Sequence, residues 1–289
     1  MFNRKPIFQK NNYYDFDLNG NLIKKDPLYT YWWDDVPNFG DWIGPFLLGK
    51  ISKRPLINVK GNFHPNALFT VGSVIEHIGK DFPDAMVWGS GLIKPLHKKR
   101  AKKLNQFISK IYAVRGKKTA HELSTKTNLS IPQVYGDPAL LMPNFYVPNT
   151  NKFIVKKASI CPHFSHLSYF NNVQNIESLN IIDVRESLLN VINEIANSSV
   201  CISTSLHGLI IAEAYEVPWV WLKISDKILD GDSFKFEDFF TTLNGGELID
   251  SIILKKEDIS EESLLNLVKF GRVYSKKYSD SLLLDALQL

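Results

Sequence analysis

The stretch SVCISTSLHGLIIAEAYEVPWVWLK, residues 199–223, contains the pattern that decides the fold. Its β-branched start, residues 200–202, predicts a buried strand, and the apolar segment after the Leu-His-Gly triplet, residues 209–215, predicts a helix. A Val-Pro pair ends that helix, and residues 219–222 predict the next strand. A strand, a helix and a further strand in this order are typical of a parallel α/β sheet.

The turn before this helix is a candidate functional site. It consists of Ser205, Leu206, His207 and Gly208, at a helix start whose free backbone N–H groups and dipole favour an anion. His207 would lie beside that anion, and an imidazole can transfer protons near neutral pH. A histidine at a helix start is also often a cap or a solvent-facing residue, so the pattern alone leaves both roles open.

Other turns that follow predicted strands carry similar features. They contain glycine, side chains that can cap a helix, or groups that can bind an anion: Asn38, Gly40, Asp41, Gly89, Ser90, Gly91, Arg115, Asp137 and His163. Because the carboxyl ends of parallel strands open onto one crevice, we expect these residues to meet there. The planar guanidinium of Arg115 matches a phosphate or a carboxylate. A loop around Gly231 is expected to carry Lys235.

These elements predict an α/β protein with two Rossmann-like domains that face a central cleft, residues 1–147 and 148–289. The boundary lies in the Pro- and Asn-rich segment 143–157, which is typical of a linker. Residues 12–25 predict a hairpin around an Asn-Gly turn. Residues 257–289 predict one or two helices that pack across the domains.

Composition restricts the class of protein. Among the 289 residues, 44% are hydrophobic and 22% are charged, as in a soluble globular protein. No apolar run reaches the roughly 20 residues of a membrane span, and the first residues lack the apolar core of a secretory signal. Cys161 and Cys201 are expected to be buried free thiols and not part of a disulfide or a metal site. A cytoplasmic enzyme fits these features.

The net charge of +4 suits an anionic small molecule or a membrane surface at least as well as nucleic acid. No nucleic-acid-binding motif occurs in the sequence. The basic run Lys94–Lys103 is most often the solvated face of a helix. Peripheral contact of this run with the inner face of the cytoplasmic membrane is the alternative.

Several motifs occur in an order that resembles the polysaccharide pyruvyl transferase family over about residues 29–242. They are NFGD (38–41), WGSG (88–91), AVRG (113–116), YGDPALL (135–141), PHF (162–164), SLHGLIIAEAYEVP (205–218) and DSFKFEDFF (232–240). The resemblance implies a GT-B-like fold. It also implies transfer of pyruvate from phosphoenolpyruvate to two hydroxyls of one sugar, which yields a cyclic ketal and inorganic phosphate.

The same resemblance implies roles for the candidate residues. His207 would protonate the enol carbon of the donor, while His163 or Asp41 would position or deprotonate the acceptor. Arg115, Lys235 and the helix start at 205–208 would hold the donor anion. Some members carry arginine where this chain has Ser205, which leaves Arg115 and Lys235 as the candidate cations. The first domain would hold the acceptor and the second the donor, without a cofactor or a metal.

Two other functions stay open at this stage. The chain could be a GT-B glycosyltransferase in which His207 and Arg115 serve the diphosphate of a nucleotide sugar, or an inert sugar-binding relative. Release of phosphate would indicate the pyruvyl transferase, and release of a nucleotide would indicate the glycosyltransferase. The acceptor, a sugar or lipid-linked oligosaccharide for an exopolysaccharide or a lipopolysaccharide, stays open among glucose, galactose, N-acetylmannosamine and Kdo.

Overall fold

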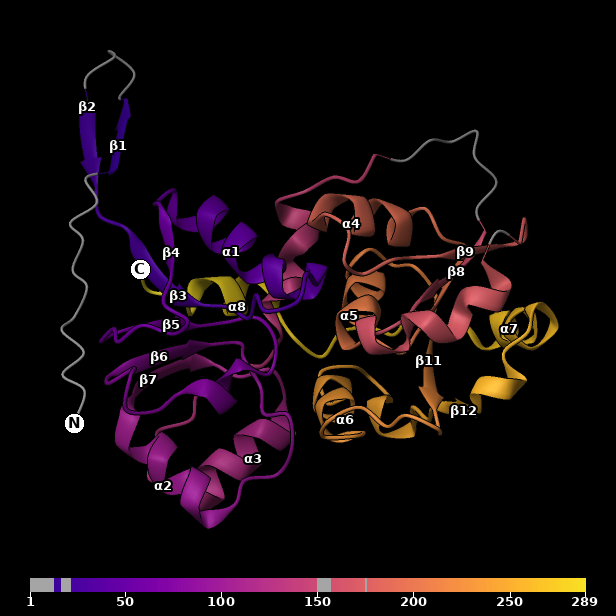
Figure 1. Cartoon of the computed structure of the whole chain (residues 1–289). Coiled ribbons are helices and arrows are strands. Elements are labelled where there is room, and N and C mark those ends of the chain that lie inside the picture. Colours follow the sequence, from indigo (N-terminus) through magenta and orange to yellow (C-terminus); the bar gives the residue numbers. More distant parts are fainter. Residues whose placement is uncertain (1–12, 17–21, 150–156, 175) are drawn as a thin grey trace.

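A computed structural model describes residues 13–16, 22–149, 157–174 and 176–289. It contains two five-stranded parallel sheets, which confirms the predicted α/β fold class (Figure 1). The first sheet has the order β4 (Leu56–Asn58), β3 (Leu28–Tyr31), β5 (Leu68–Phe69), β6 (Ala85–Trp88) and β7 (Ile108–Ala113). The second has the order β12 (Ile252–Leu254), β11 (Trp219–Ile224), β10 (Val200–Ser203), β8 (Ala158–Cys161) and β9 (Leu179–Ile181).

Each sheet is covered by helices on both faces, and we call the two layered bodies the first lobe and the second lobe. The α-helices are α1 (Phe39–Ser52), α2 (Lys98–Phe107), α3 (Lys117–Lys126), α4 (Leu188–Ala196), α5 (Leu206–Ala214), α6 (Phe234–Phe240), α7 (Glu261–Leu267) and α8 (Asp280–Asp285). Short 3₁₀ helices are η1 (Val74–His77), η2 (Pro138–Asn144), η3 (Phe164–Val173), η4 (Gly246–Leu248), η5 (Lys256–Asp258) and η6 (Val268–Phe270).

Alternation along the strands explains this layering, because successive side chains of a strand point to opposite faces. In β6, Val87 packs with α2 and α3, whereas Trp88 packs with α1 and α8. The decisive unit β10–α5–β11 is confirmed, and every residue of β10 is buried. The helix begins at Leu206 and so includes His207 in its first turn. Helix α5 is buried on nearly all sides, and it lies between β10, α4 and η2.

The two lobes share a hydrophobic core. Phe39 and Ile43 of α1 and Leu140 of η2 belong to the same buried cluster as the side chains of α4 and α5. The Phe39 backbone N–H also donates to the Val184 carbonyl of the second lobe at 2.8 Å. An interface of this apolar character holds the lobes in a defined arrangement.

The end of the chain crosses between the lobes, as predicted. Helix α7 packs on the second sheet through Leu264 and Leu267, whereas α8 lies in the first lobe (Figure 1). There the indole Nε1 of Trp88 donates to the Leu283 carbonyl at 2.8 Å, and the Leu283 side chain is fully buried. The domain boundary at 147/148 stays a prediction, since it borders residues 150–156, outside the described part.

Other expectations need correction or stay partly untested. The prediction that Lys235 lies in a loop is wrong, because Lys235 lies in α6. The hairpin strands β1 (Tyr13–Phe16) and β2 (Leu22–Lys25) pair antiparallel as predicted, but their Asn-Gly turn lies outside the described residues. Cys161 and Cys201 are buried free thiols. Within the described ranges, no helix has the length and hydrophobicity of a membrane span.

The basic run forms much of α2, and one of its cations points inward. The Arg100 guanidinium donates to the carbonyls of Ile75 and Ile78 at 2.6 and 2.7 Å, and it lies 3.6 Å from the Glu76 carboxylate. Arg100 therefore supports the fold. The lysines of α2 are exposed: Lys98, Lys99, Lys102 and Lys103. Their contact with a membrane stays a prediction.

Candidate active site

His207 enters the first lobe from the second and lies between two glycines. A Cβ atom at Gly40 would come within 2.2 Å of His207 Nδ1, so only glycine leaves room for the imidazole. On the other side, a Cβ at Gly72 would lie 3.6 Å from His207 Cε1. Gly72 has φ +92°, a conformation that favours glycine. The NFGD and LHG motifs thus pack against each other through Gly40 and His207. Gly72, which sequence reasoning missed, packs on the other side of the His207 ring.

The His207 ring is nearly enclosed by the protein. Its side chain is 11% exposed, and the buried Nε2 has no hydrogen-bond partner among the described residues. The Asp137 Oδ2 atom, 3.9 Å away, is too far for a hydrogen bond. Burial, assisted by the charges of Arg115 and Lys235, lowers the His207 pKa to about 3. The imidazole is therefore neutral in the free protein, and its buried Nε2 has unused hydrogen-bonding capacity.

Asp137, from the YGDPALL motif, lies behind this ring and shapes its surroundings. Its carboxylate accepts from the backbone N–H of Ala139 at 3.0 Å and of Gly72 at 3.4 Å, and the side chain has no exposed surface. Burial raises the Asp137 pKa to about 6, although these hydrogen bonds and Arg115 oppose the shift. Asp137 therefore fixes Gly72 in place and can change its charge near neutral pH.

Asn38 and Asp41 stand at the start of α1. Asn38 is the N-cap, and its side-chain oxygen accepts from the Gly40 N–H at 3.2 Å. Burial raises the Asp41 pKa to about 7, while a hydrogen bond with Asn38 and the charge of Lys235 act against this shift. Asp41 can consequently release or accept a proton near neutral pH, which is what a general acid or base requires.

Lys235 is the cation of this site. Burial lowers its pKa to about 8, and the charge of Arg115 adds to the effect. Its ammonium lies 5.5 Å from the centre of the Phe236 ring, and it forms no hydrogen bond or ion pair within the described part of the chain. It is near enough to affect the pKa values of Asp41, His163 and His207. A half-buried ammonium that contacts no carboxylate among the described residues is suited to bind an anionic ligand, so Lys235 marks a candidate anion site.

His163, after β8, lies in the second lobe within electrostatic reach of Lys235. Its Nδ1 lies 2.8 Å from Ser165 Oγ, and its backbone N–H donates to Thr204 Oγ1 at 2.8 Å. Burial, followed by the charge of Lys235, lowers the His163 pKa to about 3. The neighbouring His166 uses both ring nitrogens for the protein, with Thr204 Oγ1 at 3.0 Å and the Lys227 carbonyl at 2.8 Å. Among the residues described, no three acidic, histidine or cysteine side chains form a metal-binding group.

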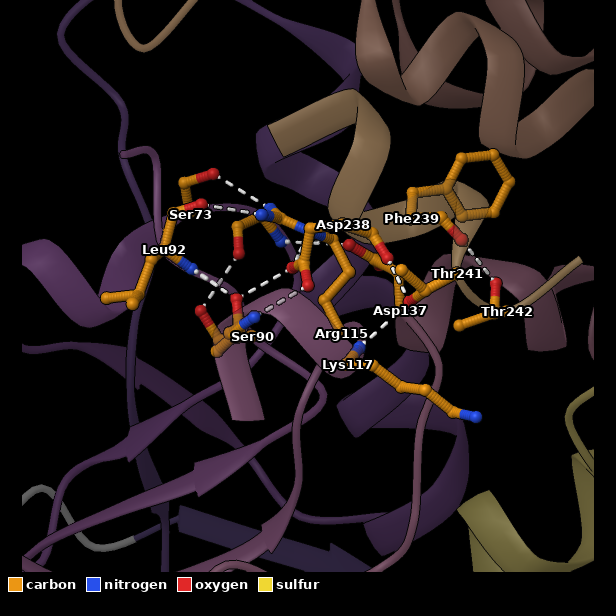
Figure 2. A network of polar contacts seen from close by, with 12 residues as sticks. Ser73, Ser90, Leu92, Arg115, Lys117, Asp137, Asp238, Phe239, Thr241 and Thr242 are labelled. Atoms are coloured by element: carbon orange, nitrogen blue, oxygen red, sulfur yellow. Dashed lines mark hydrogen bonds and ion pairs between the residues drawn. The ribbon is translucent and has the colours of Figure 1, made fainter. Parts of the chain in front are cut away.

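Arg115 has a different environment. Its guanidinium donates from Nε to Asp238 Oδ2 at 3.0 Å, from Nη1 to Ser73 Oγ at 2.8 Å and from Nη2 to the Leu92 carbonyl at 2.6 Å (Figure 2). Both charged side chains are fully buried, and Asp238 also accepts from the backbone and the hydroxyl of Thr119 at 2.8 and 2.7 Å. We call Arg115, Asp238, Thr119 and Ser73 the Arg115 latch. It joins α6 to α3 and the first sheet.

The remaining candidates pack around these groups. A Cβ at Gly91 would lie 2.3 Å from Arg115 Cζ, and one at Gly89 would lie 2.3 Å from Pro138 Cδ. The Ser90 hydroxyl donates to the Gly72 carbonyl at 2.9 Å. In the second lobe, Gly208 leaves space for Ser203 Oγ, whereas Leu206 is buried in the core and Ser205 is the N-cap of α5. The structure therefore places Gly40, Gly72 and Asp137 next to His207, and it places Asp41, His163 and His207 within electrostatic reach of Lys235.

Comparisons with known proteins agree with the motifs. Residues 11–226 match the family model described as polysaccharide pyruvyl transferase. Succinoglycan biosynthesis protein ExoV of Rhizobium meliloti is 28% identical over 222 residues, which span 74% of this chain and 64% of that protein. An uncharacterized protein of Acanthamoeba polyphaga mimivirus is 24% identical over 225 residues, which span 75% of each chain. No solved structure matches.

Proposed function

The chain belongs to the polysaccharide pyruvyl transferase family, and on this premise we propose that it transfers pyruvate from phosphoenolpyruvate to two hydroxyls of one sugar, with release of phosphate. One observation carries the proposal: the buried Nε2 of His207 and the half-buried ammonium of Lys235 both lack a hydrogen-bond partner among the described residues, and Lys235 is near enough to lower the His207 pKa. A proton carrier next to an unneutralised cation suits a small, highly charged donor. The similarity to a succinoglycan biosynthesis protein supports a polysaccharide acceptor.

Lys235 is the direct donor ligand in this proposal. Phosphoenolpyruvate carries a phosphate and a carboxylate, and a half-buried ammonium binds either strongly through charge-assisted hydrogen bonds. Arg115 contributes its charge, but its side chain has no exposed surface and donates to three protein acceptors. We therefore assign Arg115 to positioning α6, and with it Lys235.

Donor binding also gives His207 its proton. The imidazole is neutral in the free site because burial and two cations disfavour its charged form. The negative charge of the donor opposes those cations and raises the His207 pKa, since an anion nearby favours the imidazolium. His207 then transfers its proton to the methylene carbon of the donor, which leaves an electrophilic centre at the carbon that bears the phosphate oxygen.

The acceptor completes the reaction at that centre. The first sugar hydroxyl forms a C–O bond to it, and Asp41 accepts the hydroxyl proton, for which its pKa of about 7 is suited. Cleavage of the bond between this carbon and the phosphate oxygen releases phosphate. The second hydroxyl then closes the ketal ring, and its proton passes to His163, whose ring is neutral, or to the departing phosphate.

The test is incubation with phosphoenolpyruvate and a panel of glycans in deuterated water. Phosphate release together with a ketal whose methyl group contains solvent deuterium supports the proposal. A product methyl without deuterium would exclude protonation of the donor carbon. Turnover of a nucleotide sugar without turnover of phosphoenolpyruvate would assign the chain to the glycosyltransferases instead.

A further inference from the structure

A groove lies between α1 and the segment that leads into α4. Its volume is about 460 Å³, within the range of small-molecule sites. One wall belongs to each lobe: Pro37, Asn38, Trp42 and Phe46 on one side, and Arg185, Glu186, Ser187 and Leu188 on the other. We call it the α1 groove. Asn38 lines this groove and also caps α1, three residues before Asp41, so the groove lies next to the start of the helix that carries Asp41.

The residues of α1 that line the groove, together with its N-cap, recur at a regular spacing. Asn38, Trp42 and Phe46 are four residues apart, which places them along one face of the helix. Eight residues of helix rise about 12 Å, which is longer than one pyranose ring. The face begins beside Asp41 and extends outward. The groove therefore has room for a sugar unit beyond the one that would react.

The side chains of the groove suit a carbohydrate. Trp42 is 47% exposed although its helix is packed between the lobes, and Trp32 supports it with ring centres 6.2 Å apart. An exposed indole offers a flat apolar face to the C–H groups of a sugar and a polar edge to its hydroxyls. The amide of Asn38 and the hydroxyl of Ser187 add uncharged hydrogen-bonding groups.

The charges of the groove select against an acidic ligand. The guanidinium of Arg185 is held by the Asp183 carboxylate through contacts of 2.8, 3.1 and 2.6 Å, so its charge is neutralised. Glu186 adds a negative charge to the same wall. An anionic sugar would gain no unpaired cation here, in contrast to the environment of Lys235.

We propose that the α1 groove is an acceptor subsite that binds an uncharged sugar unit next to the one that receives pyruvate, with the sugar ring on Trp42. This inference rests on the proposed function and makes it more specific, because it identifies the acceptor as an oligosaccharide or a longer glycan. A monosaccharide would occupy the reaction site alone. The native acceptor would occupy the reaction site and the groove together.

The experiment compares a monosaccharide with a neutral oligosaccharide that ends in the same sugar. Trp42→Ala should raise the KM for the oligosaccharide about 3- to 10-fold, the loss expected for one aromatic contact. The KM for phosphoenolpyruvate and the kcat/KM for the monosaccharide should stay unchanged, and Trp42→Phe should restore most of the binding. Phe63→Ala removes another exposed aromatic side chain, 45% exposed, that does not line the groove, and should change neither acceptor.

The outcomes separate the subsite from the proposed function. An equal loss for both acceptors in Trp42→Ala would overturn the subsite, because it would mean that Trp42 only supports Asp41. If no acceptor supports turnover of phosphoenolpyruvate, the proposed function is wrong. The groove is then tested by a binding titration, in which the oligosaccharide is added to the protein and the tryptophan fluorescence is measured. Binding that the wild type shows and Trp42→Ala loses would then support the subsite, and absence of binding in both proteins would overturn it.

Discussion

Two buried polar clusters lie between the lobes, and they differ in how well their groups are paired. In the Arg115 latch, the guanidinium, the Asp238 carboxylate and the Thr119 hydroxyl all form hydrogen bonds with one another or with nearby groups. Around His207, the ring Nε2 and the Lys235 ammonium have no such partner among the described residues. Buried polar groups are usually paired, so the latch stabilises the protein and the unpaired cluster is the place for a ligand.

Both clusters use motif glycines in the same way. Gly91 and Gly116 leave room for Arg115 and for the backbone of Asp238, and Gly40 leaves room for His207. The glycines of WGSG, AVRG and NFGD thus accommodate protein atoms. The difference between the clusters lies in the charged side chains and not in the glycines, which makes the charged side chains the informative positions for mutation.

The largest effect is expected for His207. His207→Gln removes the proton carrier but keeps a polar side chain of related shape, and loss of such a group typically lowers the rate 10²- to 10⁴-fold. Turnover should therefore be nearly lost while the melting temperature changes little. The measurement is phosphate release and thermal unfolding on the same preparation.

A matched control for this change is His121→Gln, since His121 is an exposed histidine on α3. It should keep wild-type turnover. Should His207→Gln retain near-native turnover, the proton carrier lies elsewhere and His163 becomes the next residue to replace. Lower stability with normal turnover in the folded fraction would assign His207 to packing.

The second prediction concerns the latch, where stability should change. Arg115→Met leaves the buried Asp238 carboxylate without its counter-charge, and breaking a buried pair in this way costs about 3–5 kcal/mol. Lys118 and Glu237 form an exposed pair between the same two helices, α3 and α6. Lys118→Ala should cost no more than about 1 kcal/mol. Urea unfolding measures both, and equal losses would show that the latch has no special role.

Sequence reasoning predicted the strand ends, because local pattern determines them. Gly40, Asp137, His163 and His207 were all predicted at turns of one crevice, and the structure places Gly40 and Asp137 next to His207, while the position of His163 in that site stays a prediction. Their partners were not predictable, because the contacts join distant positions. Arg115 and Asp238 are 123 residues apart, and no local pattern connects them.

Helix α6 shows a second limit. The glycine and polar residues before it favour a loop, and aromatic residues such as Phe236, Phe239 and Phe240 have low intrinsic helix propensity. The segment is helical because these three side chains are buried between β11, α5 and the first lobe. Tertiary packing thus overrode local preference.

The third prediction is that replacing Lys235 has the opposite effect to replacing Arg115: it weakens donor binding and leaves stability unchanged. Lys235→Met should raise the KM for phosphoenolpyruvate about 10- to 100-fold, since a charge-assisted contact is worth about 1.5–3 kcal/mol. It should not lower stability, because it removes a half-buried charge that forms no hydrogen bond or ion pair with the described residues. Lys269, an exposed lysine that also lies over the ring of the phenylalanine after it, is the matched control. An unchanged donor KM in Lys235→Met would remove Lys235 from the donor site.

The smallest effect is a change in how stability depends on pH. Burial, with Arg115 and Lys235, lowers the His207 pKa to about 3, so below pH 6.5 the unfolded chain binds a proton that the folded protein does not. The contribution of His207 to the free energy of unfolding is therefore full above pH 6.5, and it decreases as the pH falls toward 3. His163 acts in the same direction. The raised pKa values of Asp41, about 7, and Asp137, about 6, act in the opposite direction, because there the folded protein binds the extra proton.

These contributions partly cancel in the wild type. The contribution of His207 is therefore measured best as the difference in the free energy of unfolding between His207→Gln and the wild type. His207→Gln cannot take up the proton, and its stability relative to the wild type should improve by about 1–2 kcal/mol between pH 7.5 and pH 5. Urea unfolding at several pH values measures this difference. Lys118→Ala, which changes only the exposed pair, should give a curve parallel to that of the wild type. A parallel curve for His207→Gln as well would mean that the folded protein can protonate His207, and the site would then lack the excess positive charge that the donor is proposed to neutralise.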